Sequence, residues 1–183
     1  MPVFGGSPVN SRLMRRFCRN KQGSAAIEFA FVAPMFFALL FAIIETSAVF
    51  FAGQYLETGT QDAARALLID DVQSKGTNQA DFKQSICDKV SALFACDNIY
   101  VDVQSFPKGD PITIVNPIDD NGNFINNFKY EPPPPKSENT VVVRAFYQWP
   151  IFVTGLGYNI ANISKYTSNS KYLLAATAAL RPQ

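Results

Sequence analysis

The sequence contains no histidine. This absence removes the Ser–His and Cys–His nucleophile pairs, histidine general bases and most zinc sites. A glycine-rich phosphate loop and a Cys-x-x-Cys motif are also missing, and the acidic residues show no paired arrangement typical of acid–base catalysis. We therefore expect a protein that is not an enzyme, with no cofactor and no metal site. A membrane-tethered enzyme or binding domain would need a polar cluster that the sequence does not display.

Charged residues are scarce as well. They make up 17% of the 183 residues, against roughly 25% in soluble domains. Hydrophobic residues account for 48%, and 16 residues are phenylalanine. The chain is long enough for one compact domain plus an appendage. Its excess of apolar side chains predicts contact with a membrane or with a partner surface.

Residues 1–23 lack acidic side chains altogether. They carry five basic residues, which are Arg12, Arg15, Arg16, Arg19 and Lys21. With these five set aside, the sixteen basic residues of the chain fall to eleven, against fifteen acidic ones. The remainder therefore offers no basic stripe for a phosphate backbone, and we expect no nucleic-acid partner. A basic segment before an apolar one is instead a signal that keeps the N-terminus in the cytoplasm.

The longest apolar run, residues 29–53, contains a single charge, Glu45. At about 1.5 Å per residue, a helix of this length crosses the roughly 30 Å of hydrocarbon in a bilayer. The run is too long for a secretory signal, and a cut after Ala52 would place Phe50 where a small side chain is required. The sequence therefore predicts three parts: a cytoplasmic leader at residues 1–23, a transmembrane helix in contact with lipid at 24–53, and a head outside the cytoplasm at 54–183.

Helical periodicity continues beyond the apolar run, through residues 54–74. One stripe of this segment is apolar and consists of Leu56, Ala63, Ala64, Leu67 and Leu68. Gly76 predicts a break, and Asn78 predicts the N-cap of a second helix. The apolar positions of that second helix are Phe82, Ile86, Val90, Leu93 and Phe94.

After Cys96 the pattern changes to alternation, which is typical of a half-buried strand. Ile99, Val101 and Val103 occupy one face of this strand, and Asp102 and Gln104 lie between them. Residues 140–149 and 172–180 predict two further strands. We expect the first of these strands to end at Trp149 and Pro150, with the Trp149 side chain packed on the core. The predicted fold class is α+β, with a long N-terminal transmembrane helix, a second helix and a three-stranded antiparallel sheet.

A long irregular insert, residues 107–138, separates the first two strands and is rich in proline. We expect a surface loop that is locally extended at its proline run. Within it, the segment IDDNGNF at residues 118–124 has two acids and a glycine. It lacks the later glutamate of a calcium loop, so a tight hairpin turn is the favoured interpretation.

The three cysteines fall on two sides of the apolar run. Cys18 lies in the leader, whereas Cys87 and Cys96 lie in the head. An even pair outside the cytoplasm predicts a disulfide, because such compartments are oxidising. Two buried free thiols are the alternative.

The junction between leader and apolar run is Gly23-Ser24-Ala25-Ala26-Ile27-Glu28-Phe29. It resembles the prepilin processing motif, in which cleavage follows a glycine and a glutamate is the fifth residue of the mature chain. Glycine lets a protease approach the backbone closely because it has no Cβ. Cleavage after Gly23 would expose an amine at Ser24, one helical turn from Glu28. A carboxylate among apolar side chains is costly unless paired, and the amine of a neighbouring subunit would pair with it. Glu28 could also be an ordinary acid at a helix N-terminus.

The stretch QGSAAIEFAFVAPMFFALLFAIIE resembles the TadE-like family, minor pseudopilins of the tight-adherence (Flp/Tad) pilus, which is a branch of the type IV pilus systems. Weaker resemblance continues through DAARAL, VVVRAFYQWPIFV and KYLLAATAALR, and none is recognised in the insert. The resemblance implies a pilin-like head, residence in the bacterial inner membrane with the head in the periplasm, and a role in pilus assembly or in the pilus itself. It also implies four partners: a prepilin peptidase, the major pilin, other minor pseudopilins and the inner-membrane assembly platform.

The resemblance also assigns roles to residues. Gly23 and Ser24 fall at the cleavage junction, Glu28 and Phe29 at the recognition pair, and Pro34 at the characteristic proline of the helix. Major pilins of these systems are very short, so the bulky head of this chain favours a minor subunit.

Two residues of the apolar run are candidates for a role in assembly. Pro34 removes one helical hydrogen bond, which could ease helix packing or extraction from the bilayer, although membrane helices also tolerate proline without such a role. Glu45 is expected at the level of the lipid headgroups, with a contact to another subunit as the second interpretation. The alternative function is an uncleaved single-pass scaffold of the assembly platform, which N-terminal sequencing would distinguish.

Overall fold

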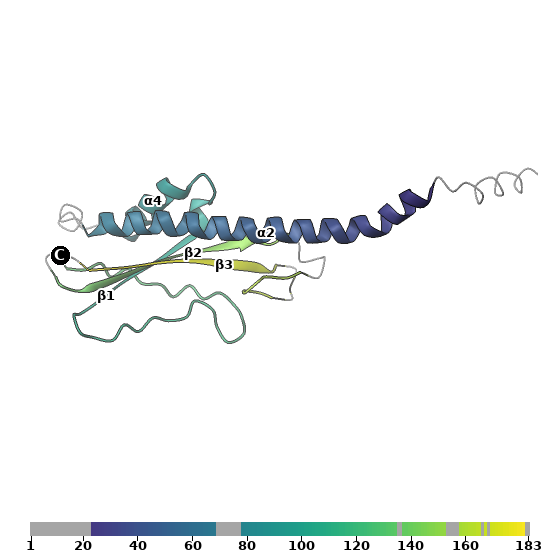
Figure 1. The fold of residues 1–183 in the computed structure, drawn as a ribbon. Coiled ribbons are helices and arrows are strands. Elements are labelled where there is room, and N and C mark those ends of the chain that lie inside the picture. The colour runs from purple at the N-terminus through teal and green to yellow at the C-terminus, as the bar shows by residue number, and fades with distance from the viewer. Residues whose placement is uncertain are drawn as a thin grey trace, which may run out of the picture. The chain divides into compact units, whose positions relative to one another are not determined.

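The computed structural model describes residues 23–68, 78–134, 137–152, 158–165, 167 and 169–181. The predicted leader therefore lies outside the described residues, except for Gly23. Figure 1 shows the element order, which is α2 (Ser24–Leu67), α4 (Gln79–Val90), the short 3₁₀ helix η2 (Cys96–Asn98), β1 (Ile99–Phe106), β2 (Thr140–Pro150) and β3 (Lys171–Leu180). The predicted α+β class, with two main helices and three strands, is confirmed.

Helix α2 joins the predicted membrane segment and its outward continuation in one element of 44 residues. The chain forms two compact units, residues 1–41 and 42–183, and α2 contributes to both. Pro34 lies inside the helix. Among the described residues, α2 is the one helix long and apolar enough to cross a membrane. The expected helical pattern up to Ser74 is described as far as Leu67, and the break predicted at Gly76 lies outside the described residues.

Helix α4 begins at the predicted cap. The side chain of Asn78 accepts a hydrogen bond of 2.9 Å from the backbone N–H of Asp81, which satisfies one of the free donors of the first turn. The helix ends at Val90, earlier than the apolar pattern predicted. Phe94 is nevertheless buried, whereas Leu93 is 37% exposed. The prediction for Leu93 was wrong because the chain has left the helical path before reaching it.

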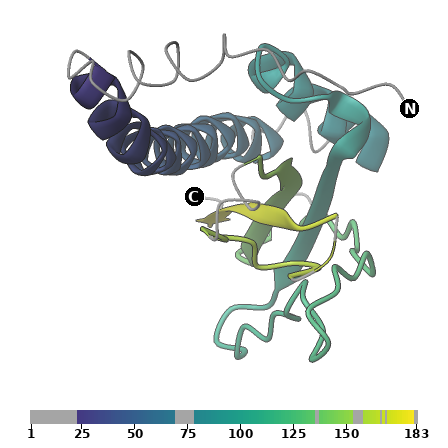
Figure 2. The ribbon, with the colours of Figure 1, turned by 90° about the vertical axis from the view of Figure 1, so that its right-hand side faces the viewer.

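The three strands form one antiparallel sheet in the order β1-β2-β3. Val101 of β1 lies opposite Ala145 of β2, which in turn lies opposite Ala176 of β3. Figure 2 shows helices α2 and α4 on one side of this sheet and the insert loops on the other. The sheet therefore presents one face to the helices. On the other face the insert packs against β1 and β2, whereas Ala175, Thr177 and Ala179 of β3 are exposed.

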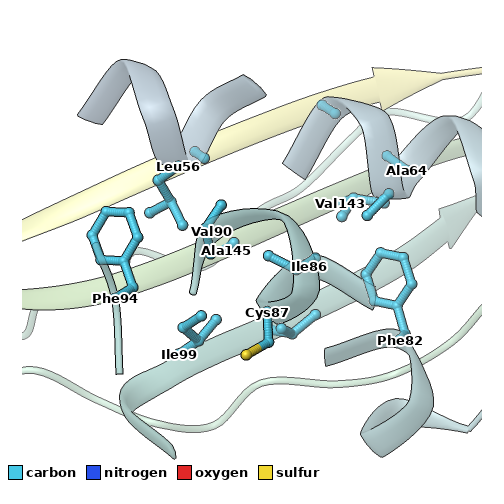
Figure 3. Close-up of a cluster of buried hydrophobic side chains, with 14 of the residues drawn as sticks. Leu56, Ala64, Phe82, Ile86, Cys87, Val90, Phe94, Ile99, Val143 and Ala145 are labelled. Carbon is cyan, nitrogen blue, oxygen red and sulfur yellow. The ribbon is translucent and has the colours of Figure 1, made fainter. Parts of the chain in front are cut away.

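The main core fills the space between the sheet and the two helices. Figure 3 shows Leu56 and Ala64 of α2 facing Ile86 and Val90 of α4, with Val143 of the sheet beside them. Small residues on α2 let the other elements approach closely. At Gly59, a Cβ would lie 2.4 Å from Cγ1 of Val90, a distance that real Cβ atoms do not show. The stripe predicted on α2 is confirmed, since Leu67 is buried in this core and Leu68 packs against it.

The opposite face of the sheet differs from the prediction at Asp102. Alternation placed Asp102 on the polar side of a half-buried strand, but its side chain is 2% exposed and pairs with Arg144, its direct cross-strand neighbour on β2. Arg144 Nη2 lies 2.7 Å from Asp102 Oδ2. The prediction was wrong because the insert covers this face and removes it from water.

Aromatic residues of the insert form a second, smaller core on that face. Phe128 stacks on Phe146 of β2 with ring centroids 4.8 Å apart, and Phe124 lies against Tyr100 of β1. The insert is irregular over its described residues, as expected, but it is a packed layer and not a solvated loop.

The hairpin turn predicted within the insert is confirmed. Ile118 and Phe124 form an antiparallel bridge, and Gly122 adopts a positive φ of 77°. That conformation favours glycine because a Cβ would clash with the backbone.

Candidate functional site

Gly23 lies directly before the first residue of α2, at an exposed position. A Cβ added there would meet nothing within 4 Å. Packing against the described residues therefore does not require glycine at this position.

Glu28 and Phe29 lie in the second turn of α2, and both are exposed. Phe29 has 66% of its side chain accessible. Glu28 follows Ser24 by four residues, so the two positions share one face of the helix. Position 28 therefore lies one helical turn from position 24.

The first half of α2 presents an apolar surface. No described residue from position 25 to position 44 is buried, and Phe31 and Met35 are each 80% exposed. Exposed side chains of this size over so many turns indicate a covering of lipid or of other helices. Pro34 belongs to this exposed segment.

Glu45 is the first buried residue along α2, with 6% of its surface exposed. Its carboxylate accepts a hydrogen bond from the backbone N–H of Phe152, which follows the end of β2. The next residue, Thr46, forms a hydrogen bond of 2.9 Å with the hydroxyl of Tyr158. The structure therefore provides Glu45 with a partner in its own chain, beside the headgroup and subunit contacts that the sequence led us to consider.

The cysteines of the head are joined in the structure. Cys87 of α4 and Cys96 of η2 form a disulfide with their Cα atoms 5.5 Å apart. Cys87 is buried in the main core, and Cys96 packs against it. The crosslink attaches the end of α4 to the start of β1.

An open groove of about 460 Å³ lies between α2 and β3. Its walls are mostly apolar and include Val49 and Phe50 of α2 and Leu174 and Ala175 of β3. Among the described residues, no group of three His, Cys, Asp or Glu side chains could hold a metal ion. In the insert, Asp119 uses its carboxylate to accept backbone N–H groups of its own turn, from Asn121 and Asn123.

The functional residues predicted from sequence fall into separate places. Gly23, Glu28 and Phe29 lie together at the start of α2, whereas the disulfide belongs to the head. Sequence reasoning missed Phe152 and Tyr158, whose partners on α2 lie more than a hundred positions earlier. A pattern local to either segment carries no signal for contacts of that range.

The comparisons with known proteins agree with the N-terminal resemblance. Residues 23–65 match the family model of TadE-like proteins, so the match begins at Gly23 and ends near the end of α2. No curated protein and no solved structure matches the chain. The resemblance predicted for the N-terminal segment is confirmed, and a TadE-like segment is characteristic of proteins associated with the Tad pilus.

Proposed function

We propose that this chain, whose residues 23–65 are TadE-like, is a minor pseudopilin of a tight-adherence pilus. A prepilin peptidase cuts it after Gly23, and the mature protein acts in pilus assembly or as a minor component of the fibre. Its partners are the major pilin, other minor pseudopilins and the assembly platform of the inner membrane.

One observation carries this proposal: the TadE-like match, the start of α2 and the predicted cleavage junction coincide at residues 23–24. Cleavage there would leave a mature chain that begins with its helix. The exposure of Gly23, and the lack of any described atom within 4 Å of a Cβ added there, support access by a protease.

The topology follows from the distribution of charge. Five basic residues precede the junction, and no acidic residue accompanies them, which favours a leader in the cytoplasm and a head in the periplasm. The disulfide between Cys87 and Cys96 fits an oxidising compartment for the head.

Glu28 gives the mature helix a means of recognising another subunit. After cleavage, the new amine of Ser24 carries a positive charge, and a carboxylate at position 28 of an adjacent helix can neutralise it. In an apolar environment each of these charges is costly alone, so the pairing favours association of two helices in register.

Two substitutions separate processing from assembly. Gly23→Leu places a bulky side chain at the scissile bond, so the full-length precursor should accumulate in the membrane. Glu28→Ala leaves that bond accessible, so cleavage should continue while copurification with other pilus subunits weakens. Ala30→Leu is the matched control, because it adds the same side chain at an exposed position of the same helix. Intact mass of protein extracted from cells with and without the peptidase measures the first effect.

The outcomes distinguish the alternatives. A wild-type protein that keeps residues 1–23, or a Gly23→Leu variant that is cut and assembled normally, would refute the pseudopilin proposal and favour the uncleaved scaffold. If Glu28→Ala stays uncut as well, the peptidase itself recognises Glu28, and the role of this residue in assembly loses its support.

A further inference from the structure

The exposed part of α2 has the length of a bilayer's hydrocarbon core. Residues 25–44 contain no buried side chain, and Glu45 is the first buried one. Twenty residues at about 1.5 Å each give about 30 Å, which matches the hydrocarbon thickness. If the chain is anchored in a membrane, as the proposed function requires, the outer boundary of the hydrocarbon lies near Glu45. The sequence alone had placed the end of the membrane segment at Gly53.

Two segments of the head reach α2 at this level. The backbone N–H of Phe152 binds the carboxylate of Glu45, and the hydroxyl of Tyr158 binds Thr46. The first bond holds the backbone of Phe152 beside the helix, while 79% of the surface of this residue is exposed. Tyr158 is 39% exposed. The head thus contacts the helix at the level of Glu45 and Thr46.

Aromatic side chains of α2 itself continue this surface outward. Phe50 is 70% exposed and Phe51 is 64% exposed. They lie five and six residues beyond Glu45, which is about 8 Å along the helix axis. This is the depth of the headgroup region, where helices that lie on a membrane insert apolar side chains such as phenylalanine. Phe51 also stacks on Tyr55, with ring centroids 6.4 Å apart.

We propose that Phe50, Phe51, Phe152 and Tyr158 form an aromatic collar that contacts the outer leaflet of the bilayer. The head is then seated on the membrane surface, and Glu45 serves as the internal acceptor that holds the Phe152 segment at the interface. The occupant of this surface is lipid, because the exposed Ile43 and Ile44 lie directly before Glu45 on the helix that carries Phe50 and Phe51. No charged residue interrupts the sequence of α2 between Glu45 and Glu57, so this length of helix carries no charge that lipid would have to exclude.

Fluorescence quenching by brominated lipid tests the collar. The chain has a single tryptophan, so Trp149→Phe provides a dark background for new reporters. Three variants carry one tryptophan each, at Phe36, Phe152 or Ile112, and all three positions are exposed in the structure. The full chain is reconstituted in phosphatidylcholine vesicles with brominated acyl chains, and emission is compared with that in unbrominated vesicles. Circular dichroism checks that each variant keeps its fold.

The expected result is loss of emission for Phe36→Trp and Phe152→Trp and little loss for Ile112→Trp, which lies in the insert. If Phe36→Trp is not quenched, the membrane anchor itself is refuted and the proposed function with it. If Phe36→Trp is quenched while Phe152→Trp behaves like Ile112→Trp, the collar alone is refuted. Quenching at position 152 that persists at high dilution of protein in lipid supports lipid contact. If emission at position 152 is not quenched but shifts in wavelength with the protein-to-lipid ratio, a second copy of the chain covers this surface. That result overturns the proposal.

Discussion

The two faces of the sheet are built in different ways. The face toward α2 and α4 is apolar throughout, with Val101, Val143 and Ala176 packed under helical side chains. The face toward the insert has the buried pair Asp102–Arg144 near its centre, beside stacked aromatic rings. Both faces contain buried side chains, but the first is specified by shape and periodicity and the second by hydrogen bonds. The structure of the helix-side face can therefore be predicted from sequence, whereas that of the other face depends on where the long insert packs.

The ion pair attaches the insert at two points. Arg144 donates from Nη1 to the backbone carbonyl of Val115 at 2.8 Å, and Asp102 accepts from the backbone N–H of Lys129 at 2.9 Å. Two residues of the sheet therefore hold both ends of the insert's hairpin region. A buried pair with its remaining donors and acceptors satisfied tolerates the absence of water, whereas either partner alone would not.

The largest expected effect is on this insert face. Asp102→Ala leaves the guanidinium of Arg144 buried without its carboxylate, and we expect a loss of about 3–5 kcal/mol in the free energy of unfolding. Chemical denaturation in detergent measures it. Glu138→Ala is the control, because it removes an exposed carboxylate that pairs with Lys108 and Arg181. The double variant Asp102→Leu/Arg144→Met should recover much of the loss. If Asp102→Ala and Glu138→Ala have the same free energy of unfolding, the hydrogen bonds of Asp102 do not specify the insert side of the sheet.

The second largest effect is expected from the disulfide between Cys87 and Cys96, which belongs to the core on the helix side of the sheet. The disulfide closes a loop with a sequence separation of 9 residues. In the chain-entropy description such a loop contributes about 2.5–3 kcal/mol, so Cys87→Ala/Cys96→Ala should lower the free energy of unfolding by about that amount. Wild-type protein under reducing conditions should behave similarly. Alkylation of both thiols in denatured, unreduced protein from its native compartment would contradict the crosslink.

Close packing of the helix face can be tested with two glycines of α2. Gly59→Ala places a methyl group 2.4 Å from Cγ1 of Val90, whereas Gly53→Ala places one at an ordinary 3.7 Å from Cδ2 of Leu174. Alanine in a helix gains about 1 kcal/mol over glycine at both positions, but overpacking costs about 1–3 kcal/mol at Gly59 alone. Gly59→Ala should therefore melt at a lower temperature than Gly53→Ala. Equal melting temperatures would mean that α4 moves away from α2 freely.

The difference between the faces also explains how far sequence could predict the structure. Helix α2, the cap at Asn78 and the strand positions Val101 and Val103 follow from local periodicity and capping chemistry, so they could be predicted. Asp102 was assigned to the correct face of its strand, but its burial depends on an insert that begins after that strand has ended. The periodicity of the strand sequence does not indicate whether a distant loop covers one of its faces. The candidate site differs in the same way between its residues. The motif at Gly23 is local in sequence and could be predicted, whereas Glu45 accepts a hydrogen bond from Phe152, a residue after β2 that no local pattern indicates.

The smallest expected effect concerns the turn of the insert, where a polar anchor is exposed to water. Asp119 Oδ1 accepts backbone N–H groups of Asn123 at 2.6 Å and Asn121 at 3.0 Å. The hydrogen bond from the Asn123 backbone is the main reason that the pKa of the Asp119 carboxyl lies below its ordinary value. In the unfolded chain the pKa is about 3.9. The contribution of Asp119 to stability is therefore fully present above that pH and is lost as the pH falls through the lower folded pKa.

Because water competes for the carboxylate, this pH-dependent contribution should be slight in comparison with the effect of Asp102→Ala. Asp119→Asn should flatten the acid limb of the stability curve, since the amide oxygen still accepts hydrogen bonds but does not titrate. Asp120→Asn is the matched control, because it removes the same charge one residue later and the Asp120 side chain has no hydrogen bond with the residues that the structure describes. This variant should leave the acid limb of the stability curve closer to that of the wild type. The measurements are the carboxyl titration of Asp119 by NMR and denaturation curves on either side of pH 4. An Asp119 titration at or above the unfolded value would show that the turn does not bind its carboxylate, and polar anchoring of the insert would then rest on Asp102 and Arg144 without support from the turn.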